Sequence, residues 1–334
     1  MAEVPVDIKE NDILKLSPEL LNTLLKDHTL STEDKQVNIF WATDNYSDRG
    51  KGFQYKDPIT IESITGENGD IIVPRALKSR ATQQQRSREM AEVFTPSWIC
   101  NKQNNLIDNA WFGREGVFNT EVDNPDGSHS WIVNENPIEF PEGKTWRDYV
   151  NENRMEITCG EAPYLVSRYD TVTGEPIPIN KRIGLLDRKL RVVSENTTKS
   201  TEWLKAAQSA YQSIYGYEWQ GDNLVLAREA LLFTFIDYFR EKFNKDPQLK
   251  SLLFIAYIIS WNIWQMDGLK GVIPDSCGER LIIEKNLFEE REIITKCDGC
   301  KDGSIKDHNG IYALIKDWNA PKEKQKIRFI DLMK

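Results

Sequence analysis

Three short apolar segments, separated by helical patterns, constrain the fold of this chain more than any other feature. The first, residues 154–160, ends in a glycine. The second, residues 213–219, ends in the acid Glu218, and the third, residues 261–268, ends in the acid Asp267. An order of strand, helix, strand, helix and strand is typical of right-handed crossovers in a parallel sheet. We therefore predict an α/β core.

The intervals between these segments have the apolar spacing of amphipathic helices. Residues 183–193 and 203–211 lie between the first two predicted strands, and residues 222–239 and 247–259 lie between the second and third. Apolar residues recur there every three or four positions, which places them on one helix face. Each crossover is thus predicted to contain two helices.

We divide the chain into three parts. Residues 1–90 are predicted to form an irregular α+β region, with a helix that begins at Ser17–Pro18 and short strands at 37–41, 59–64 and 71–73. Its end is a helix near 83–92 in a basic stretch, and such charges usually form a solvated helix face. The basic residues are Arg75, Lys78, Arg80, Arg86 and Arg88.

Residues 91–270 contain the predicted core, and residues 271–334 form a C-terminal extension. A helix over 97–111 opens the core, with Thr95 as its predicted cap and Pro96 in the first turn. Residues 112–150 are rich in Gly, Asn, Asp and Pro but contain scattered aromatic residues, so we expect loops and short strands there rather than a flexible linker.

Composition excludes several classes of protein. A net charge of −9 argues against a nucleic-acid surface that covers the whole body. The longest apolar run, residues 252–264, is too short to span a bilayer, and residues 2–10 lack the apolar centre of a secretory signal. Five cysteines with uneven spacing do not form a disulfide framework. We expect a cytoplasmic protein without a membrane segment.

The ends of the three predicted strands carry a candidate ligand site. In open α/β folds, small ligands bind at the carboxyl edge of the sheet. The turn at Gly160 would expose backbone N–H groups there, and Glu218 is placed to accept the two hydroxyls of a ribose. Asp267 could accept from an exocyclic amine, and Trp219 could lie against a purine. Alternatively, the two acids cap the helices that follow them.

Four motifs in the same order resemble those of gamma-class N6-adenine DNA methyltransferases, the modification subunits of restriction-modification systems. Residues 93–96 (VFTP) resemble the family's upstream motif, and residues 155–165 resemble its cofactor loop. Residues 216–219 are similar to its ribose-binding acid motif, and residues 262–268 to its third strand. The resemblance implies a Rossmann-like core that binds S-adenosylmethionine and methylates DNA.

The resemblance also implies a set of cofactor-binding residues, which lie in the four motifs. They are Phe94, Thr95, Pro96, Thr158, Cys159, Gly160, Glu161, Tyr164, Glu218, Trp219, Asp267 and Gly268.

Two departures from the family pattern limit what the resemblance implies. Ala162–Pro163 stands where the family has the second glycine of the cofactor loop, so one backbone N–H is missing. The catalytic tetrapeptide Asn/Asp-Pro-Pro-Tyr/Phe does not occur, and the Asn-Pro pairs are Asn124–Pro125 and Asn136–Pro137. We therefore assign no catalytic residue, and expect a partner polypeptide to supply catalysis and DNA recognition. The alternative is a non-catalytic scaffold of a restriction or phage-defence locus that keeps the fold.

The C-terminal extension contains a separate candidate for a metal site. Cys277, Cys297, Cys300 and His308 are ligands of the type that zinc prefers, and Cys297 and Cys300 are two residues apart in a predicted turn. Zinc is one interpretation of this set. The alternative is a group of reduced surface cysteines.

Overall fold

A three-stranded parallel sheet lies at the centre of the fold. Its strands follow one another in space as they do in the chain, in the order β5-β6-β7. Gly216 of the middle strand faces Glu156 on one side and Ile263 on the other. The prediction of a mixed α/β protein with a parallel sheet is confirmed. The strands are β5 (Arg154–Glu156), β6 (Ile214–Glu218) and β7 (Ile263–Gln265).

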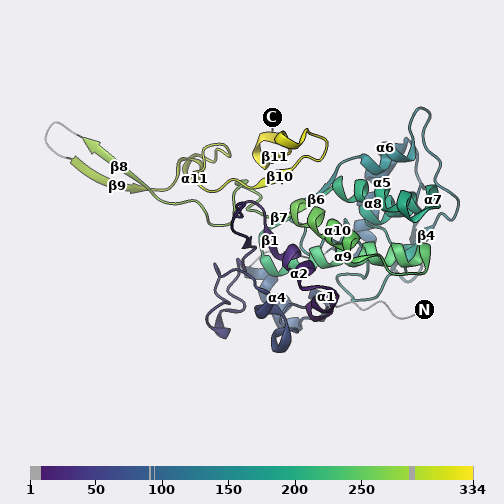
Figure 1. Ribbon diagram of the computed structural model, residues 1–334, viewed down its shortest axis with the longest axis horizontal. Coiled ribbons are helices and arrows are strands. Elements are labelled where there is room, and N and C mark those ends of the chain that lie inside the picture. Colours follow the sequence, from purple (N-terminus) through teal and green to yellow (C-terminus); the bar gives the residue numbers. More distant parts are fainter. Residues whose placement is uncertain (1–8, 90–91, 94, 286–289, 334) are drawn as a thin grey trace.

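The computed structural model describes residues 9–89, 92–93, 95–285 and 290–333. Figure 1 shows helices packed around the sheet and one β-hairpin that projects far from them. None of the helices in these described ranges is both long and apolar enough to cross a bilayer.

Two helices form each crossover, as predicted. Helices α8, α9 and α10 pack against the sheet, and α7 packs on α8 and α9. Nearly every residue of α9 from Gly221 to Phe239 is buried, so this helix lies inside the core rather than on its surface. The first crossover contains α7 (Leu185–Asn196) and α8 (Ser200–Gln212), and the second contains α9 (Gly221–Phe243) and α10 (Leu249–Asn262).

The N-terminal region packs into the same hydrophobic core as the sheet, since Ile13, Leu21 and Trp41 belong to the cluster that contains Phe235 and Ile263. Its helices are α1 (Glu10–Leu16) and α2 (Pro18–Leu25), and its strands are β1 (Lys26–Asp27) and β2 (Val37–Asn38), which pair antiparallel.

Two of the strands predicted in this region are wrong. Residues 61–64 form the helix α3 (Ile61–Ile64), because Thr60 and Ser63 make a capping box that fixes a helix start. Residues 71–73 are bends and coil without strand pairing. Single-turn 3-10 helices occupy Ser47–Arg49, Gly66–Asn68 and Arg75–Leu77.

The predicted helices on either side of residue 93 are present, with corrections to their details. In α4 (Arg80–Glu89), Arg86 is only 2% exposed, so the basic stretch is not simply a solvated face. In α5 (Ser97–Phe112), the cap position is Pro96 rather than Thr95, and the carboxylate of Asp170 accepts the Ser97 N–H at 2.7 Å.

The insertion at 112–150 contains a hairpin and a short helix, and the C-terminal extension contains two more antiparallel pairs. The insertion has β3 (Asn119–Asp123), β4 (His129–Val133) and α6 (Trp146–Asn151). The extension has β8 (Arg280–Lys285), β9 (Glu290–Thr295), α11 (Asp298–Asp302), β10 (Leu314–Lys316) and β11 (Lys326–Arg328). Further 3-10 turns lie at Ile179–Lys181, Lys322–Lys324 and Phe329–Leu332.

One buried cation joins the N-terminal region to the sheet. The guanidinium of Arg228, on α9, donates to the carbonyls of Leu24 and Lys26, and also to those of Ser260 and Ile263. Burial lowers the pKa of Arg228 to about 10, so the group is still charged at neutral pH. A single side chain thus holds the ends of α2 and α10 against the start of β7.

Replacing Arg228 by methionine should destabilise the protein strongly. Arg228→Met keeps most of the volume but removes the guanidinium donor from four carbonyl oxygens, three of them in buried hydrogen bonds, so we expect the free energy of unfolding to fall by about 3 kcal/mol or more. Urea denaturation followed by circular dichroism measures the change. Lys250→Met, at an exposed position of α10, is the matched control and should change stability by less than about 0.5 kcal/mol. Equal stability of the two variants would contradict the role given to Arg228.

Candidate functional site

A cavity of about 1010 Å³ opens at the carboxyl edge of the parallel sheet. Its walls come from the loops that follow β5, β6 and β7, together with two segments of the N-terminal region. Parallel strands end at one edge, and for this reason three stretches far apart in sequence meet there.

Most of the cofactor-binding residues implied by the family resemblance line this cavity. They are Thr95, Thr158, Cys159, Gly160, Tyr164, Glu218, Trp219, Asp267 and Gly268. Pro96, the cap residue of α5, is not among the lining residues. Phe94 lies outside the described residues.

Glu161 is a correction to the predicted set. Its side chain is buried away from the cavity, where its carboxylate accepts the Arg75 N–H at 2.6 Å and the Tyr169 hydroxyl at 2.6 Å. Glu161 therefore fastens the N-terminal region to the loop. The nearby Glu156 acts in a similar way and accepts the N–H groups of Tyr164 and Leu165.

The loop after β5 has a backbone that usually requires glycine. Thr158, Gly160 and Ala162 have positive φ angles of 46°, 53° and 62°. Ala162 thus adopts a left-handed conformation without being glycine, and its side chain is fully buried. Ala162 therefore forms the same kind of turn as the glycine of the family motif would. Pro163, which also lines the cavity, has no backbone N–H to offer a ligand.

Glu218 connects this loop to the middle strand. One carboxylate oxygen accepts the Gly160 N–H at 2.9 Å, and the other accepts the Gln220 N–H at 3.2 Å, at the start of α9. Burial raises the pKa of Glu218, although the backbone N–H groups partly offset the effect. Each oxygen keeps a second lone pair, so the carboxylate can cap the helix and still accept a ligand hydroxyl.

Asp267 stabilises the turn after β7. One of its oxygens accepts the N–H groups of Leu269 and Lys270, and the other lies 3.1 Å from the Lys270 ammonium. The turn passes very close to the middle strand, since a Cβ at Gly268 would lie 2.5 Å from the Tyr217 ring. Like Glu218, Asp267 both caps its own turn and lines the cavity.

Sequence reasoning missed the residues that reach the cavity from the N-terminal region. The indole N–H of Trp219 donates to the Tyr55 hydroxyl at 3.1 Å, and Tyr55 donates to Asp275 at 2.6 Å. The aromatic wall of the cavity is therefore fixed by a loop 164 residues away in the chain. Other lining residues that were not predicted include Arg88, Glu92, Tyr217, Asn223 and Met266.

A buried polar network supports the cavity from behind. Arg86 makes ion pairs with Glu92 at 2.5 Å and Asp222 at 2.8 Å, and it donates to Gln220 at 2.7 Å. Glu92 and Gln220 line the cavity. Arg86 thus positions the N-terminal region against the start of α9, and no simple sequence pattern marks an arginine for this role.

The four predicted metal ligands converge in the C-terminal extension. Their ligand atoms all lie within 4.8 Å of one another. The Nδ1 atom of His308 lies 3.6 Å from the Sγ atoms of Cys277, Cys297 and Cys300. A tetrahedral site with Zn–S bonds of about 2.3 Å and a Zn–N bond of about 2.0 Å has N···S edges of about 3.5 Å. The cluster could therefore hold a metal ion.

The backbone of the Cys297–Cys300 turn is adapted to this cluster. Cys297 caps α11, and its sulfur accepts the Cys300 N–H at 3.3 Å. A Cβ at Gly299 would lie 2.7 Å from the His308 Nδ1 atom, so only glycine allows the imidazole to approach. Burial raises the pKa of Cys297, but the Asn309 N–H and other hydrogen bonds outweigh it and lower that pKa to about 6, which favours a thiolate.

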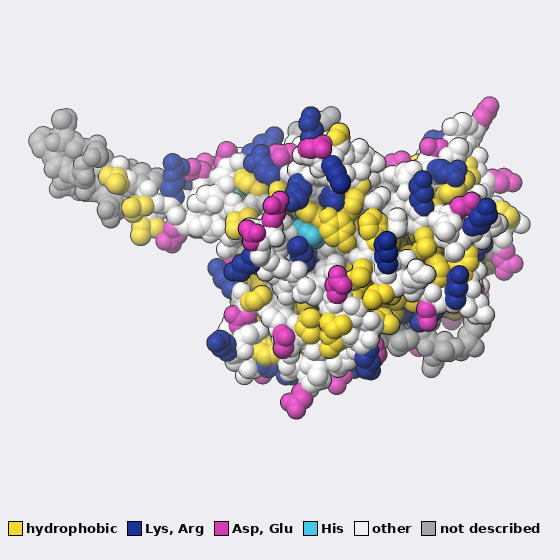
Figure 2. All heavy atoms as spheres, in the orientation of Figure 1, with side chains coloured by type: hydrophobic (Ala, Val, Ile, Leu, Met, Phe, Trp, Pro, Cys, Tyr) yellow, Lys and Arg dark blue, Asp and Glu magenta, His cyan; other side chains and the backbone are white. Residues whose placement is uncertain are grey.

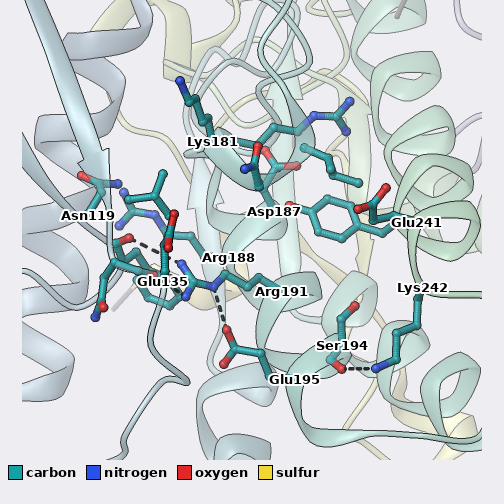
Figure 3. A pocket seen from close by; sticks show the side chains of 17 residues that line it. Asn119, Glu135, Lys181, Asp187, Arg188, Arg191, Ser194, Glu195, Glu241 and Lys242 are labelled. Carbon is teal, nitrogen blue, oxygen red and sulfur yellow. Dashed lines mark hydrogen bonds and ion pairs between the residues drawn. The ribbon is translucent and has the colours of Figure 1, made fainter. Parts of the chain in front are cut away.

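A second cavity, of about 490 Å³, lies between α7, α9 and the β3–β4 insertion, as shown in Figure 3. Its charged side chains are largely used within the protein. Arg191 pairs with Glu195 at 2.8 Å, and Lys242 donates to the Ser194 carbonyl at 2.8 Å. We assign no function to this cavity.

Comparisons with known proteins give no family assignment, because no protein-family model, curated protein or solved structure matches the chain.

Proposed function

We propose that the chain is the S-adenosylmethionine-binding part of a DNA adenine-N6 methyltransferase of a restriction-modification system, with a Rossmann-like core. One observation carries the proposal. Glu218, the last residue of β6, lines a single cavity together with Trp219, Gly160 in the turn after β5 and Asp267 in the turn after β7. A cavity of about 1010 Å³ is ample for a nucleoside cofactor.

The lining residues suit the parts of an adenosyl group. Glu218 would accept the ribose hydroxyls, and its burial makes each hydrogen bond to the carboxylate stronger than in water. The Trp219 ring, held by Tyr55, would cover one face of the adenine, and Asp267 would accept from the exocyclic amine. The turn at Gly160 would hold the methionine part.

Catalysis and DNA recognition would come from outside these 334 residues. Adenine methylation needs an acceptor pair at the flipped base and an aromatic face to hold it. Neither Asn124 nor Asn136, the asparagines that precede proline, is among the residues that line the cavity. A partner strand has a place to add, because β5 is an edge strand of the parallel sheet among the described residues and its Met155 is 46% exposed.

S-adenosylmethionine should raise the melting temperature of the protein, because a ligand that binds the folded state alone stabilises it by mass action. Glu218→Gln keeps the shape of the side chain but removes the charge, so it should abolish most of the shift. Glu218→Ala should have at least the same effect. Glu142→Ala, at an exposed loop position, is the control and should retain the full shift. Differential scanning fluorimetry and titration calorimetry make the measurement. Absence of heat with the unmodified protein at about 1 mM cofactor, a concentration at which even weak binding is detectable, would rule out the cofactor site.

The chain alone should not methylate DNA, because it lacks the catalytic tetrapeptide and its net charge of −9 disfavours autonomous contact with phosphates. The test is incubation of the purified protein with tritiated S-adenosylmethionine and mixed-sequence DNA. We expect no label in adenine. Label in adenine with this chain alone would show that some other segment performs the role of the tetrapeptide.

The second candidate is a non-catalytic scaffold or interaction protein of a restriction or phage-defence locus. Two observations favour it. Pro163 removes an N–H from the cofactor loop, and Glu218 and Asp267 already cap backbone N–H groups of the protein. The calorimetric experiment separates the two candidates, since a scaffold has no need of the cofactor.

We also propose that the metal of the Cys277, Cys297, Cys300 and His308 cluster is zinc. Three thiolates and one imidazole are a soft ligand set, and tetrahedral sites of this composition are typical of structural zinc. With all four positions filled by protein atoms, the ion would have a structural role.

The purified protein should contain one equivalent of zinc by mass spectrometry of the metal. Cys297→Ser removes a ligand, and we expect zinc affinity to fall by more than about 100-fold, since loss of even an outer-shell partner costs about 10- to 100-fold. Cys100→Ser changes a buried cysteine outside the cluster, and this control should keep its zinc. Equal zinc content in the two variants would contradict the assignment.

A further inference from the structure

We infer that the metal centre positions the cavity acid Asp267 through a short ladder at Val272. The inference rests on the proposed metal centre and is independent of which nucleoside cofactor the cavity binds.

The ladder lies between the turn of Asp267 and the end of the metal-binding segment. Val272 bridges to Asp267 on one side and to Tyr312 on the other. The Asp267 N–H donates to the Val272 carbonyl at 2.8 Å, and the Ala313 N–H donates to the Gly271 carbonyl at 3.0 Å. The turn of residues 267–271 is therefore fixed from outside by the segment around Tyr312.

Both sides of this ladder lead directly to metal ligands. Cys277 follows Ile273 by four residues, and His308 precedes Ile311 by three. The Ile273 N–H donates to the Ile311 carbonyl at 2.8 Å, and the His308 N–H donates to the Tyr312 hydroxyl at 2.9 Å. A metal bound to Cys277 and His308 would close the open end of the ladder, as a cross-link between its two sides.

The tip of the turn is less tightly packed than its start. Asp267 is buried and Gly268 lies against the Tyr217 ring, whereas Leu269 is 90% exposed. Local regions with few buried apolar contacts open at low free-energy cost. Residues 268–271 should therefore respond when the ladder opens.

The same centre lies at the base of the projecting hairpin. Cys277 precedes β8 and Cys297 follows β9, so the metal would join the two ends of the arm. Figure 2 shows hydrophobic side chains on the described part of this arm, and Leu281, Ile283 and Ile294 are exposed there. A metal at the base of the β8–β9 hairpin would keep motion of the hairpin from disturbing the turn of residues 267–271.

Hydrogen exchange of backbone amides tests the inference without any ligand in the cavity. We expect the amides of residues 268–271 to exchange about tenfold faster after zinc is removed with a chelator, because the ladder then opens more often. Adding zinc back should restore protection. Peptides from α9 should not respond, since that helix is buried in the core. Unchanged exchange at 268–271 after verified loss of the metal would overturn the inference.

Calorimetry with S-adenosylmethionine in the presence and absence of zinc separates this inference from the proposed function. No binding in either form, together with metal-dependent exchange, would refute the cofactor and support the metal connection. Binding of equal affinity in both forms, together with metal-independent exchange, would support the cofactor and refute the metal connection.

Discussion

The guanidinium of Arg228 is the interaction on which the arrangement of the sheet and the N-terminal region depends. It is buried on α9 and donates to carbonyls at the ends of α2 and α10 and at the start of β7. These are carbonyls that a helix end or a short strand leaves without a partner. Because one cation satisfies several of them, the short β7 can sit inside the core at its fixed position. The carboxyl end of the sheet, and with it the cavity, follows from that position.

The order of strands and helices could be predicted from the sequence, because the spacing of apolar residues and the residue types at strand ends are local signals. The segment that ends at Glu218 is a strand, whereas in the segment that ends at Asp267 only Ile263–Gln265 are strand and the two residues before them end α10. The four crossover helices lie close to where the apolar spacing predicts them. Predictions failed where a local capping signal competed with alternation. Residues 59–64 have the apolar pattern of a strand, but Thr60 and Ser63 provide both hydrogen bonds of a capping box, and residues 61–64 form a helix. The basic stretch around Arg86 predicts a surface position, because its partners Glu92 and Asp222 are recognisable only in three dimensions.

The candidate site was predictable to a similar extent. Gly160, Glu218 and Asp267 could be found because each follows its own strand, and parallel strands bring such positions to one edge. Tyr55 could not be found, since nothing in its neighbourhood indicates that it supports Trp219. Glu161 lies next to Gly160 in sequence but points to the other side of the loop, toward Arg75 and Tyr169. Ala162 shows why a comparison of residue types with a family motif is not sufficient, because this alanine adopts the left-handed backbone conformation expected of glycine.

The edge position of β5 has a consequence for handling the purified protein. In the part of the chain that the structure describes, β5 is an edge strand of the parallel sheet, and Met155 and Ile157 are exposed there. A strand edge of this kind is a template for pairing with another chain. Two copies could join edge to edge there and bury those side chains. With only three residues, β5 offers few hydrogen bonds, so such association would be weak and would increase with concentration. Solubility should therefore be limited by this edge, and a lysine at Met155 should act as the gatekeeper that the natural sequence lacks at that position.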